Sequence, residues 1–274
     1  MHKTRKRQSG GNPSTICIII SFTQSMSFLK IPILLPSVWL FNISFMSPNA
    51  PPNDSERVYG ALYERICPTL FPILHRVWFL NLCGDKKLTY LQLSASIPCI
   101  AELAVILAMN YPSTLSSRVL SLLVISGQLP TRSVNACFFG GAVFAAIGSL
   151  GRLWCFRAMG HNFTHQLAIR KNHQLITTGP YAIVRHPGYL FGAMSALGMS
   201  LVMGSPGSFT RRCGWLETTL GRVVIGVWTM QNVSVWVLSY MRCQHEDALL
   251  RERFGVEWDD YAQRVRYQMI PGVY

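Results

Sequence analysis

The chain has 274 residues, of which 50% are hydrophobic and only 14% are charged. Soluble domains carry about 25% charged residues, so the composition argues against a soluble protein and predicts an all-α, polytopic integral membrane protein. The net charge of +13 suits loops that face an anionic leaflet, and the scattered basic residues argue against a nucleic-acid partner. The eight cysteines include no CxxC and no zinc-type spacing, so we predict neither a disulfide framework nor a metal site.

The hydropathy pattern predicts five transmembrane helices, or six if residues 66–83 also cross. Residues 1–27 are a basic tail that we expect to be disordered. The five apolar runs are 28–45, 91–109, 134–153, 189–203 and 220–240, and the run 119–129 is too short to span by itself. Charged residues and prolines interrupt residues 55–83, which suits an interfacial helix or a poor span. We therefore divide the chain into a tail (1–27), N-terminal membrane helices with an interfacial segment (28–133), and a C-terminal core (134–274).

Basic residues predict which side of the membrane each connection faces. Arginines and a lysine lie between the third and fourth spans, and more arginines follow the last span. Both groups should face the cytosol. With five spans this places the N-terminus in the lumen, although its basic tail predicts the cytosolic side. Either residues 66–83 cross the membrane, or the first 25 residues are not part of the working protein.

The connector from His173 to Tyr189, HQLITTGPYAIVRHPGY, is polar and rich in rings and turns, although it separates two apolar spans. Gly179-Pro180 predicts a turn, and Pro187 forces the preceding His186 into a non-helical conformation. A re-entrant loop that only touches lipid head groups is one interpretation. A binding site for a ligand at the bilayer surface is the interpretation we favour.

Two further motifs flank the spans. Residues 160–165, GHNFTH, close the third span, and Arg242 and Glu246 lie just after the last one. Four-residue spacing puts Arg242 and Glu246 on one helix face. A surface ion pair would explain them equally well when they are taken alone. Ionisable residues at the membrane edge favour a functional site. The tail that follows is amphipathic, and Gly255 should interrupt its helix.

Taken together, GHNFTH, HQLITTGPYAIVRHPGY, the pattern R-x-x-x-E-D-x-L-x-x-x-F-G, and the later WDDY and IPG resemble the isoprenylcysteine carboxyl methyltransferase family. More widely, they resemble the membrane phospholipid methyltransferase group. The resemblance covers roughly residues 150–274, and the proline-rich loop after the first span is similar to fungal members.

The resemblance implies an integral endoplasmic-reticulum enzyme whose active site faces the cytosol. Such enzymes transfer a methyl group from S-adenosyl-L-methionine to the carboxylate of a C-terminal prenylated cysteine. Arg242 matches the family's catalytic, substrate-binding arginine. The implied cofactor contacts are His173, Gln174, Leu175, Ile176, Tyr181, His186, Pro187, Gly188, Tyr189 and Glu246. The chain departs from the family pattern at Gly188, where a serine is usual, and at Ala168, where a glutamine contacts the cofactor. The change at Gly188 removes a hydroxyl but keeps a close backbone approach, whereas the change at Ala168 puts one cofactor contact in doubt.

Three alternatives stay open at this point. The acceptor could be a phospholipid or another small amphiphile, because the helices and the cofactor loop would serve either acceptor. A membrane sterol reductase that uses NADPH is a different class, but it would have asparagine where this chain has Gly188. The departures at Ala168 and Gly188 also suit a non-catalytic scaffold. The predicted partners are prenylated proteins or a lipid-like acceptor, together with membrane lipids, and the sequence specifies no oligomeric state.

Overall fold

The computed structural model of the chain describes residues 28–50, 52–53, 55–56, 90–126, 128–131, 133–165, 168 and 174–273. Its helices run in the order α2 (Ile31–Phe45), α5 (Tyr90–Asn110), α6 (Thr114–Leu123), α7 (Ala136–Met159), α8 (Pro187–Gly204), α9 (Phe209–Arg212), α10 (Thr219–Phe254) and α11 (Val256–Arg264). Short 3-10 turns lie at Phe28–Lys30, Gly160–Asn162, Gly179–Ala182 and Trp215–Glu217. No β-strand element occurs among these residues, so the predicted all-α fold is confirmed.

Local signals explain where several helices begin. Asn135 precedes α7 and its side chain accepts a hydrogen bond from the backbone N–H of Phe138 at 2.8 Å. The Thr218 hydroxyl caps α10 in the same way. Pro187 occupies the first position of α8, where a missing backbone N–H costs nothing.

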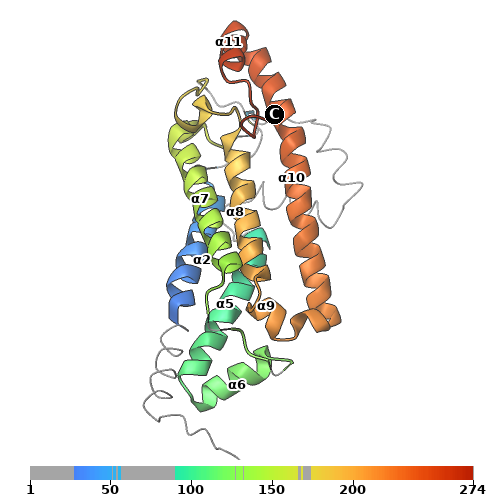
Figure 1. Ribbon diagram of the computed structural model, residues 1–274. Helices are drawn as coiled ribbons and strands as arrows, with labels where there is room; N and C mark the ends of the chain where they lie inside the picture. Colours follow the sequence, from blue (N-terminus) through green and yellow to red (C-terminus); the bar gives the residue numbers. More distant parts are fainter. Residues whose placement is uncertain are drawn as a thin grey trace, which may run out of the picture.

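Among the described helices, α7 and α8 pack against each other most extensively, and they lie side by side at the centre of the bundle (Figure 1). A Cβ atom added to Gly148 would collide with the backbone nitrogen of Ser195, and one added to Gly198 would collide with the backbone of Ala145. The hydroxyls of Ser149 and Ser195 also bond each other at 2.7 Å. Small residues therefore allow the two backbones to approach closely, as is typical of membrane helices.

Contacts at the two ends of the bundle define the helix directions. At one end, Arg152 of α7 donates to the carbonyl of Ser44 at the end of α2, so these two helices run in parallel. At the other end, Lys30 precedes α2 and bonds the carbonyl of Gly207 after α8. Helix α8 is therefore antiparallel to α2 and α7, and the start of α8 shares one end of the bundle with α11 (Figure 1).

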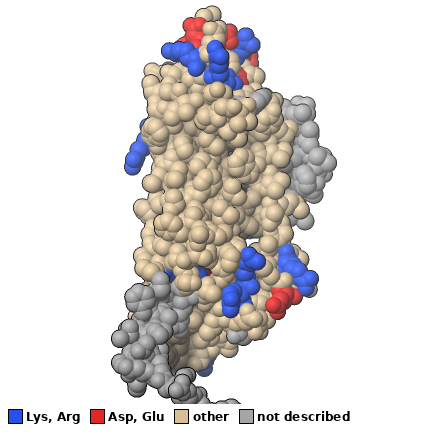
Figure 2. All heavy atoms as spheres, in the orientation of Figure 1, with Lys and Arg blue, Asp and Glu red and all other residues tan. Residues whose placement is uncertain are grey.

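Four described helical segments are long and apolar enough to cross a bilayer: Phe28–Phe45, Gln92–Asn110, Ala136–Asn162 and Pro187–Gly204. They correspond to the first four predicted spans. The visible face of the protein has a broad band almost free of charged side chains between two charged ends (Figure 2). The polytopic membrane class is therefore confirmed.

The fifth predicted span, 220–240, is helical but is not among these four segments. The amides of Gln231 and Asn232 lie in its middle and reduce its apolar character. Helix α10 continues without a break through Arg242 to Phe254. Gly255, with φ of 54°, separates it from α11, as predicted. The predicted tail 1–27 and most of the mixed segment 55–83 lie outside the described residues, and nothing tests the division of the chain at residues 27 and 133.

A buried ion pair lies far from the loop before α8. Lys30 Nζ is 2.6 Å from Glu102 Oε1, and both side chains are almost fully buried. The second carboxylate oxygen accepts from the backbone N–H of Phe209 at 3.1 Å, and Lys30 also lies 5.2 Å from the ring centre of Phe138. The pair connects α2, α5, α7 and α9, and its hydrogen-bonding groups are satisfied within the protein.

Candidate functional site

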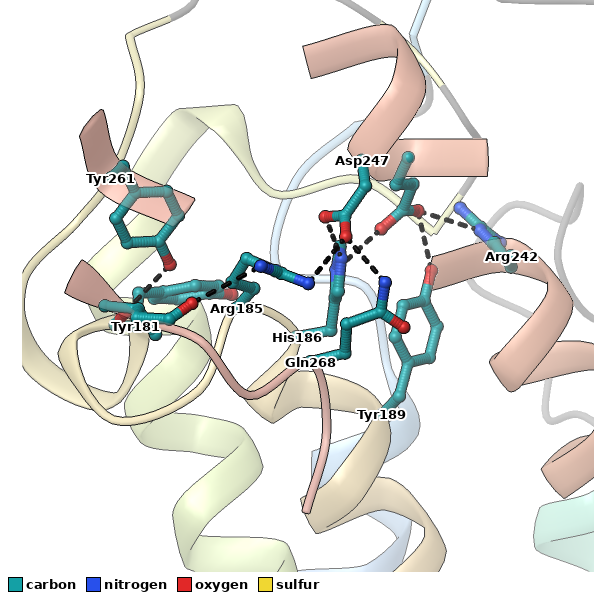
Figure 3. A network of polar contacts seen from close by, with 10 residues as sticks. Tyr181, Arg185, His186, Tyr189, Arg242, Asp247, Tyr261 and Gln268 are labelled. Atoms are coloured by element: carbon teal, nitrogen blue, oxygen red, sulfur yellow. Dashed lines mark hydrogen bonds and ion pairs between the residues drawn. The ribbon is translucent and has the colours of Figure 1, made fainter. Parts of the chain in front are cut away.

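The candidate site lies at the end of the bundle where the loop before α8 meets the C-terminal half of α10 (Figure 3). The loop forms a 3-10 turn at Gly179–Ala182, and His186 then has φ of −125° and ψ of 58°, outside the helical region. Pro187 causes this conformation because it clashes with a helical preceding residue. The loop thereby directs His186 toward two carboxylates on α10.

Glu246 is the first of these carboxylates and has three partners. Its Oε1 lies 3.0 Å from Arg242 Nε and accepts a hydrogen bond from the Tyr189 hydroxyl at 2.7 Å, while its Oε2 lies 3.4 Å from His186 Nδ1. Burial raises the pKa of Glu246, but Arg242, then His186 and Tyr189, outweigh burial and lower it to about 2. Glu246 is therefore ionised at neutral pH, and its side chain remains 21% exposed.

Asp247 is the second carboxylate. Its Oδ1 lies 2.7 Å from His186 Nε2, and its Oδ2 lies 3.2 Å from Arg185 and accepts from Gln268 Nε2 at 2.8 Å. Both ring nitrogens of His186 therefore face carboxylates. Burial lowers the pKa of His186, but the hydrogen bonds to Asp247 and Glu246 outweigh burial and raise it to about 9. His186 is thus a cation at neutral pH and bridges two anions.

Arg152, about two turns before the end of α7, adds a further cation inside the bundle. Its Nε donates to the Ser44 carbonyl and its Nη1 to the Gly188 carbonyl, each at 2.7 Å. Its guanidinium also lies over the rings of Phe45 and Phe156, at 4.8 and 5.4 Å. No acidic side chain in the described part of the chain pairs with it. A buried, unneutralised guanidinium beside the loop suits an anionic ligand.

His165 of the GHNFTH segment lies near the same arginines. Its ring makes edge contacts with Phe156 and Phe163, and its Nε2 is buried with no hydrogen-bond partner among the described residues. Burial, and then the charges of Arg152 and Arg242, lower the pKa of His165 to about 3. The His165 ring is therefore neutral, and the contribution of the two arginines to its lowered pKa indicates a positive electrostatic potential around it.

The structure brings together four of the residues predicted for the site: His186, Tyr189, Arg242 and Glu246. Tyr181 is buried nearby, and its backbone carbonyl accepts a hydrogen bond from the Tyr261 hydroxyl at 2.8 Å.

Pro187 and Gly188 form the first turn of α8, next to the cluster. Gln174, Leu175 and Ile176 lie in the irregular segment before the turn and make no side-chain hydrogen bond or ion pair with the cluster in the described part of the chain. His173 lies outside the described residues.

Four residues of this region were not predicted as site residues: Asp247, Arg185, Gln268 and Arg152. Asp247 follows Glu246 directly, and Arg185 precedes His186, so both could have been found as charges within the motifs. Arg152 could have been found as an arginine near the end of an apolar span. Gln268 has no sequence signal, because only the return of the chain places it near Asp247.

No group of three or more histidine, cysteine and acidic residues in the described ranges has an arrangement that could hold a metal ion. The cysteines described, Cys99, Cys137, Cys155, Cys213 and Cys243, are free thiols.

Fold and site together define a polytopic helical membrane protein with a buried, ion-paired cluster at one end of its bundle. The predicted family resemblance is confirmed. Residues 141–212 match the model of the isoprenylcysteine carboxyl methyltransferase (ICMT) family. This segment contains most of α7, the loop, α8 and α9.

Curated relatives extend the similarity. A probable protein-S-isoprenylcysteine O-methyltransferase of Oryza sativa subsp. indica is 31% identical over 127 residues, which is 46% of this chain and 56% of that protein. Protein-S-isoprenylcysteine O-methyltransferase of Schizosaccharomyces pombe is 28% identical over 124 residues, 44% of each chain. The nickel-cobalt-cadmium resistance protein NccN of Alcaligenes xylosoxydans xylosoxydans is 28% identical over 124 residues, 45% of each chain. The chain thus spans about half the length of the curated relatives it matches.

Proposed function

We propose that this protein transfers a methyl group from S-adenosyl-L-methionine to the C-terminal carboxylate of prenylated cysteine. One observation carries the proposal. Two motifs that are far apart in the sequence, the loop before α8 and the Arg242–Asp247 segment of α10, meet in one cluster at the end of a membrane bundle, within a chain that matches the methyltransferase family. Three cationic side chains, Arg185, His186 and Arg242, surround the two carboxylates of the cluster, and Arg152 adds a fourth cation. This surplus of positive charge favours an anionic acceptor.

The residues of the cluster fit the proposed cofactor. S-adenosylmethionine supplies a methyl group that is activated by the positive charge of a sulfonium. Glu246 is ionised and partly exposed, so it can hold a cationic or hydrogen-donating group. A Cβ atom on Gly188 would meet nothing within 4 Å, so there is open space at the loop–helix junction. We assign residues 174–176, Tyr181, residues 186–189 and Glu246 to the cofactor site.

The acceptor's chemistry suits this arrangement. A carboxylate is ionised at neutral pH, so its attack on a methyl group requires no general base. His186 would be a poor base in any case, because it is a cation between two carboxylates. Alignment and exclusion of water remain the tasks of the protein, and well-oriented encounters can supply about 7–11 kcal/mol.

We assign Arg242 to the acceptor carboxylate. Glu246 bonds the Nε of Arg242, and the guanidinium lies 5.8 Å from the ring centre of Tyr189. These two contacts fix the orientation of the Arg242 guanidinium. Arg152 lies at the same end of the bundle and would add positive potential for the same anion. Between the bundle and lipid, a prenyl chain can remain in an apolar environment while its carboxylate reaches the cluster.

We further propose that the site faces the cytosol at the endoplasmic-reticulum membrane. The end of the bundle that holds the site carries arginines on α7, α10, α11 and the adjoining loops: Arg157, Arg185, Arg242, Arg251, Arg253, Arg264 and Arg266. Such an excess near the ends of spans is typical of the cytosolic side.

The test is a methylation assay. Membranes that contain the protein are incubated with labelled S-adenosylmethionine and N-acetyl-S-farnesylcysteine, and base-labile methyl ester is measured. Two matched acceptors serve as controls: one has a carboxamide in place of the carboxylate, and the other lacks the farnesyl group. We expect label only on the farnesylated acid. Label that appears instead on lipid amines, or no ester at all, would contradict the proposal.

A further inference from the structure

The C-terminal segment returns to the loop that precedes α8. We call residues 265–269, which follow α11, the C-terminal strap. Two backbone hydrogen bonds join the strap to the loop: Arg185 N–H donates to the Tyr267 carbonyl at 3.0 Å, and His186 N–H donates to the Gln268 carbonyl at 2.8 Å. The side chain of Gln268 is buried. The strap lies beyond residue 212, where the match to the family model ends.

Side chains reinforce this connection. Gln268 donates to Asp247 Oδ2 at 2.8 Å, and the other oxygen of Asp247 meets His186 Nε2 at 2.7 Å. Arg185 completes the group, with its guanidinium 3.2 Å from Asp247 Oδ2 and its Nη1 donating to the Val265 carbonyl at 3.4 Å. The strap therefore contacts His186 twice, directly through the backbone and indirectly through Asp247 (Figure 3).

We infer that Asp247 and Gln268 are positioning residues of the cofactor site, which act by holding His186 between α10 and the start of α8. This inference rests on the proposed function, because it concerns the same site. With both ring nitrogens facing carboxylates, His186 connects Glu246 on α10 to the loop before α8. Loss of that connection would move Glu246 relative to the loop and weaken cofactor binding.

The charge of His186 gives the inference a pH signature. The groups that face its ring are Asp247 and Glu246 from α10 and Tyr189 from α8, and Asp247 in turn faces Arg185 and Gln268. Burial lowers the pKa of His186, but the two carboxylates raise it from 6.5 to about 9. The charged bridge is therefore fully present below pH 6.5 and is lost as the pH rises through about 9.

The experiment measures the affinity of the purified full-length protein for S-adenosylhomocysteine, by calorimetry from about pH 6 to about pH 10. For the wild type we expect constant affinity near neutral pH and a decline as the pH passes about 9. Asp247→Asn should weaken binding about tenfold at neutral pH, because a charge-assisted hydrogen bond is lost. It should also move the alkaline decline to lower pH, because Asn cannot stabilise the imidazolium. Asp247→Glu should restore the decline near its wild-type position.

Two matched controls test whether the effects depend on where the acid and the amide lie, and not merely on the loss of one acid or one amide. Asp260→Asn removes an exposed acid on α11, and Gln263→Ala removes an exposed amide there. Neither should change the affinity or its pH profile. Gln268→Ala should weaken binding by about fivefold, because Asp247 loses one donor.

Asp247→Asn and Gln268→Ala also separate a positioning role from a merely structural one. If Asp247→Asn lowers thermal stability but leaves both the affinity and the alkaline decline unchanged, the inference is wrong. If Asp247→Asn does not fold, the comparison of Gln268→Ala with Gln263→Ala decides, and equal affinities would overturn the inference. A wild-type protein that does not bind S-adenosylhomocysteine would overturn the proposed function itself, and this inference with it.

Discussion

Replacing Arg242 by alanine removes a guanidinium that is almost fully buried and that bonds Glu246 at 3.0 Å. Removing one partner of an isolated buried ion pair costs about 3–5 kcal/mol. Glu246 keeps the Tyr189 hydroxyl at 2.7 Å and His186 Nδ1 at 3.4 Å, so its charge is not left uncompensated. We therefore expect the cofactor side to lose only about 1 kcal/mol, or about fivefold in affinity for S-adenosylhomocysteine.

Turnover should fall much further than affinity in Arg242→Ala. If Arg242 orients the acceptor carboxylate, its loss resembles the loss of a donor that stabilises a reacting oxygen, which costs about 10²- to 10³-fold. Arg242→Lys should also be impaired, because a compact ammonium cannot replace a planar, two-donor contact.

The assay compares kcat/KM for N-acetyl-S-farnesylcysteine with the Kd of S-adenosylhomocysteine. Arg253→Ala, which removes an exposed arginine of the same helix, serves as the matched control and should change neither quantity. If Arg242→Ala loses S-adenosylhomocysteine affinity as strongly as turnover, Arg242 serves the cofactor, and the assignment to the acceptor is refuted.

Three further outcomes follow from packing, burial and hydrogen bonding. Gly148→Ala should lower the thermal unfolding temperature, with an overpacking cost of about 1–3 kcal/mol, because its Cβ would collide with the α8 backbone. Gly140→Ala is the control, because its Cβ would meet nothing within 4 Å, and equal unfolding temperatures for the two variants would contradict this packing. Lys30→Met should destabilise the protein by about 3–5 kcal/mol, because it leaves buried Glu102 unpaired, and adding Glu102→Leu should recover part of that loss. A double variant that is less stable than Lys30→Met would contradict a stabilising role of this ion pair. Tyr189→Phe should weaken S-adenosylhomocysteine binding about fivefold, because the hydroxyl that donates at 2.7 Å to the site carboxylate is lost, and unchanged calorimetric affinity would show that this bond is dispensable.

The first four spans could be predicted closely because each signal is local. An apolar run of membrane length folds as a helix wherever it lies in the chain, since the backbone groups have no other partner in lipid. The observed helices α2, α5, α7 and α8 therefore agree with the predicted runs within a few residues at most of their ends. Two helices extend beyond their predicted runs: α7 continues to Met159, and α10 continues to Phe254. Both continue because charged residues that end an apolar run do not end a helix.

The candidate site could be predicted where it depends on helix geometry. Arg242 and Glu246 pair because residues four apart share a helix face. His186 leaves the helical region because a proline follows it. The role of Asp247 was missed, because its position next to Glu246 does not indicate which residue meets its side chain.

The amino-acid sequence by itself determined the helices, the turn before α8 and the pair on α10, because these depend on neighbours within about one helical turn. Only the tertiary structure decided that Gln268 meets Asp247, that Arg152 meets the Gly188 carbonyl, and that Lys30 pairs with Glu102, which lies 72 residues further along the chain. Hydropathy and spacing carry no information about which helices become neighbours. Close packing of small residues and the cost of burying an unpaired charge select those neighbours.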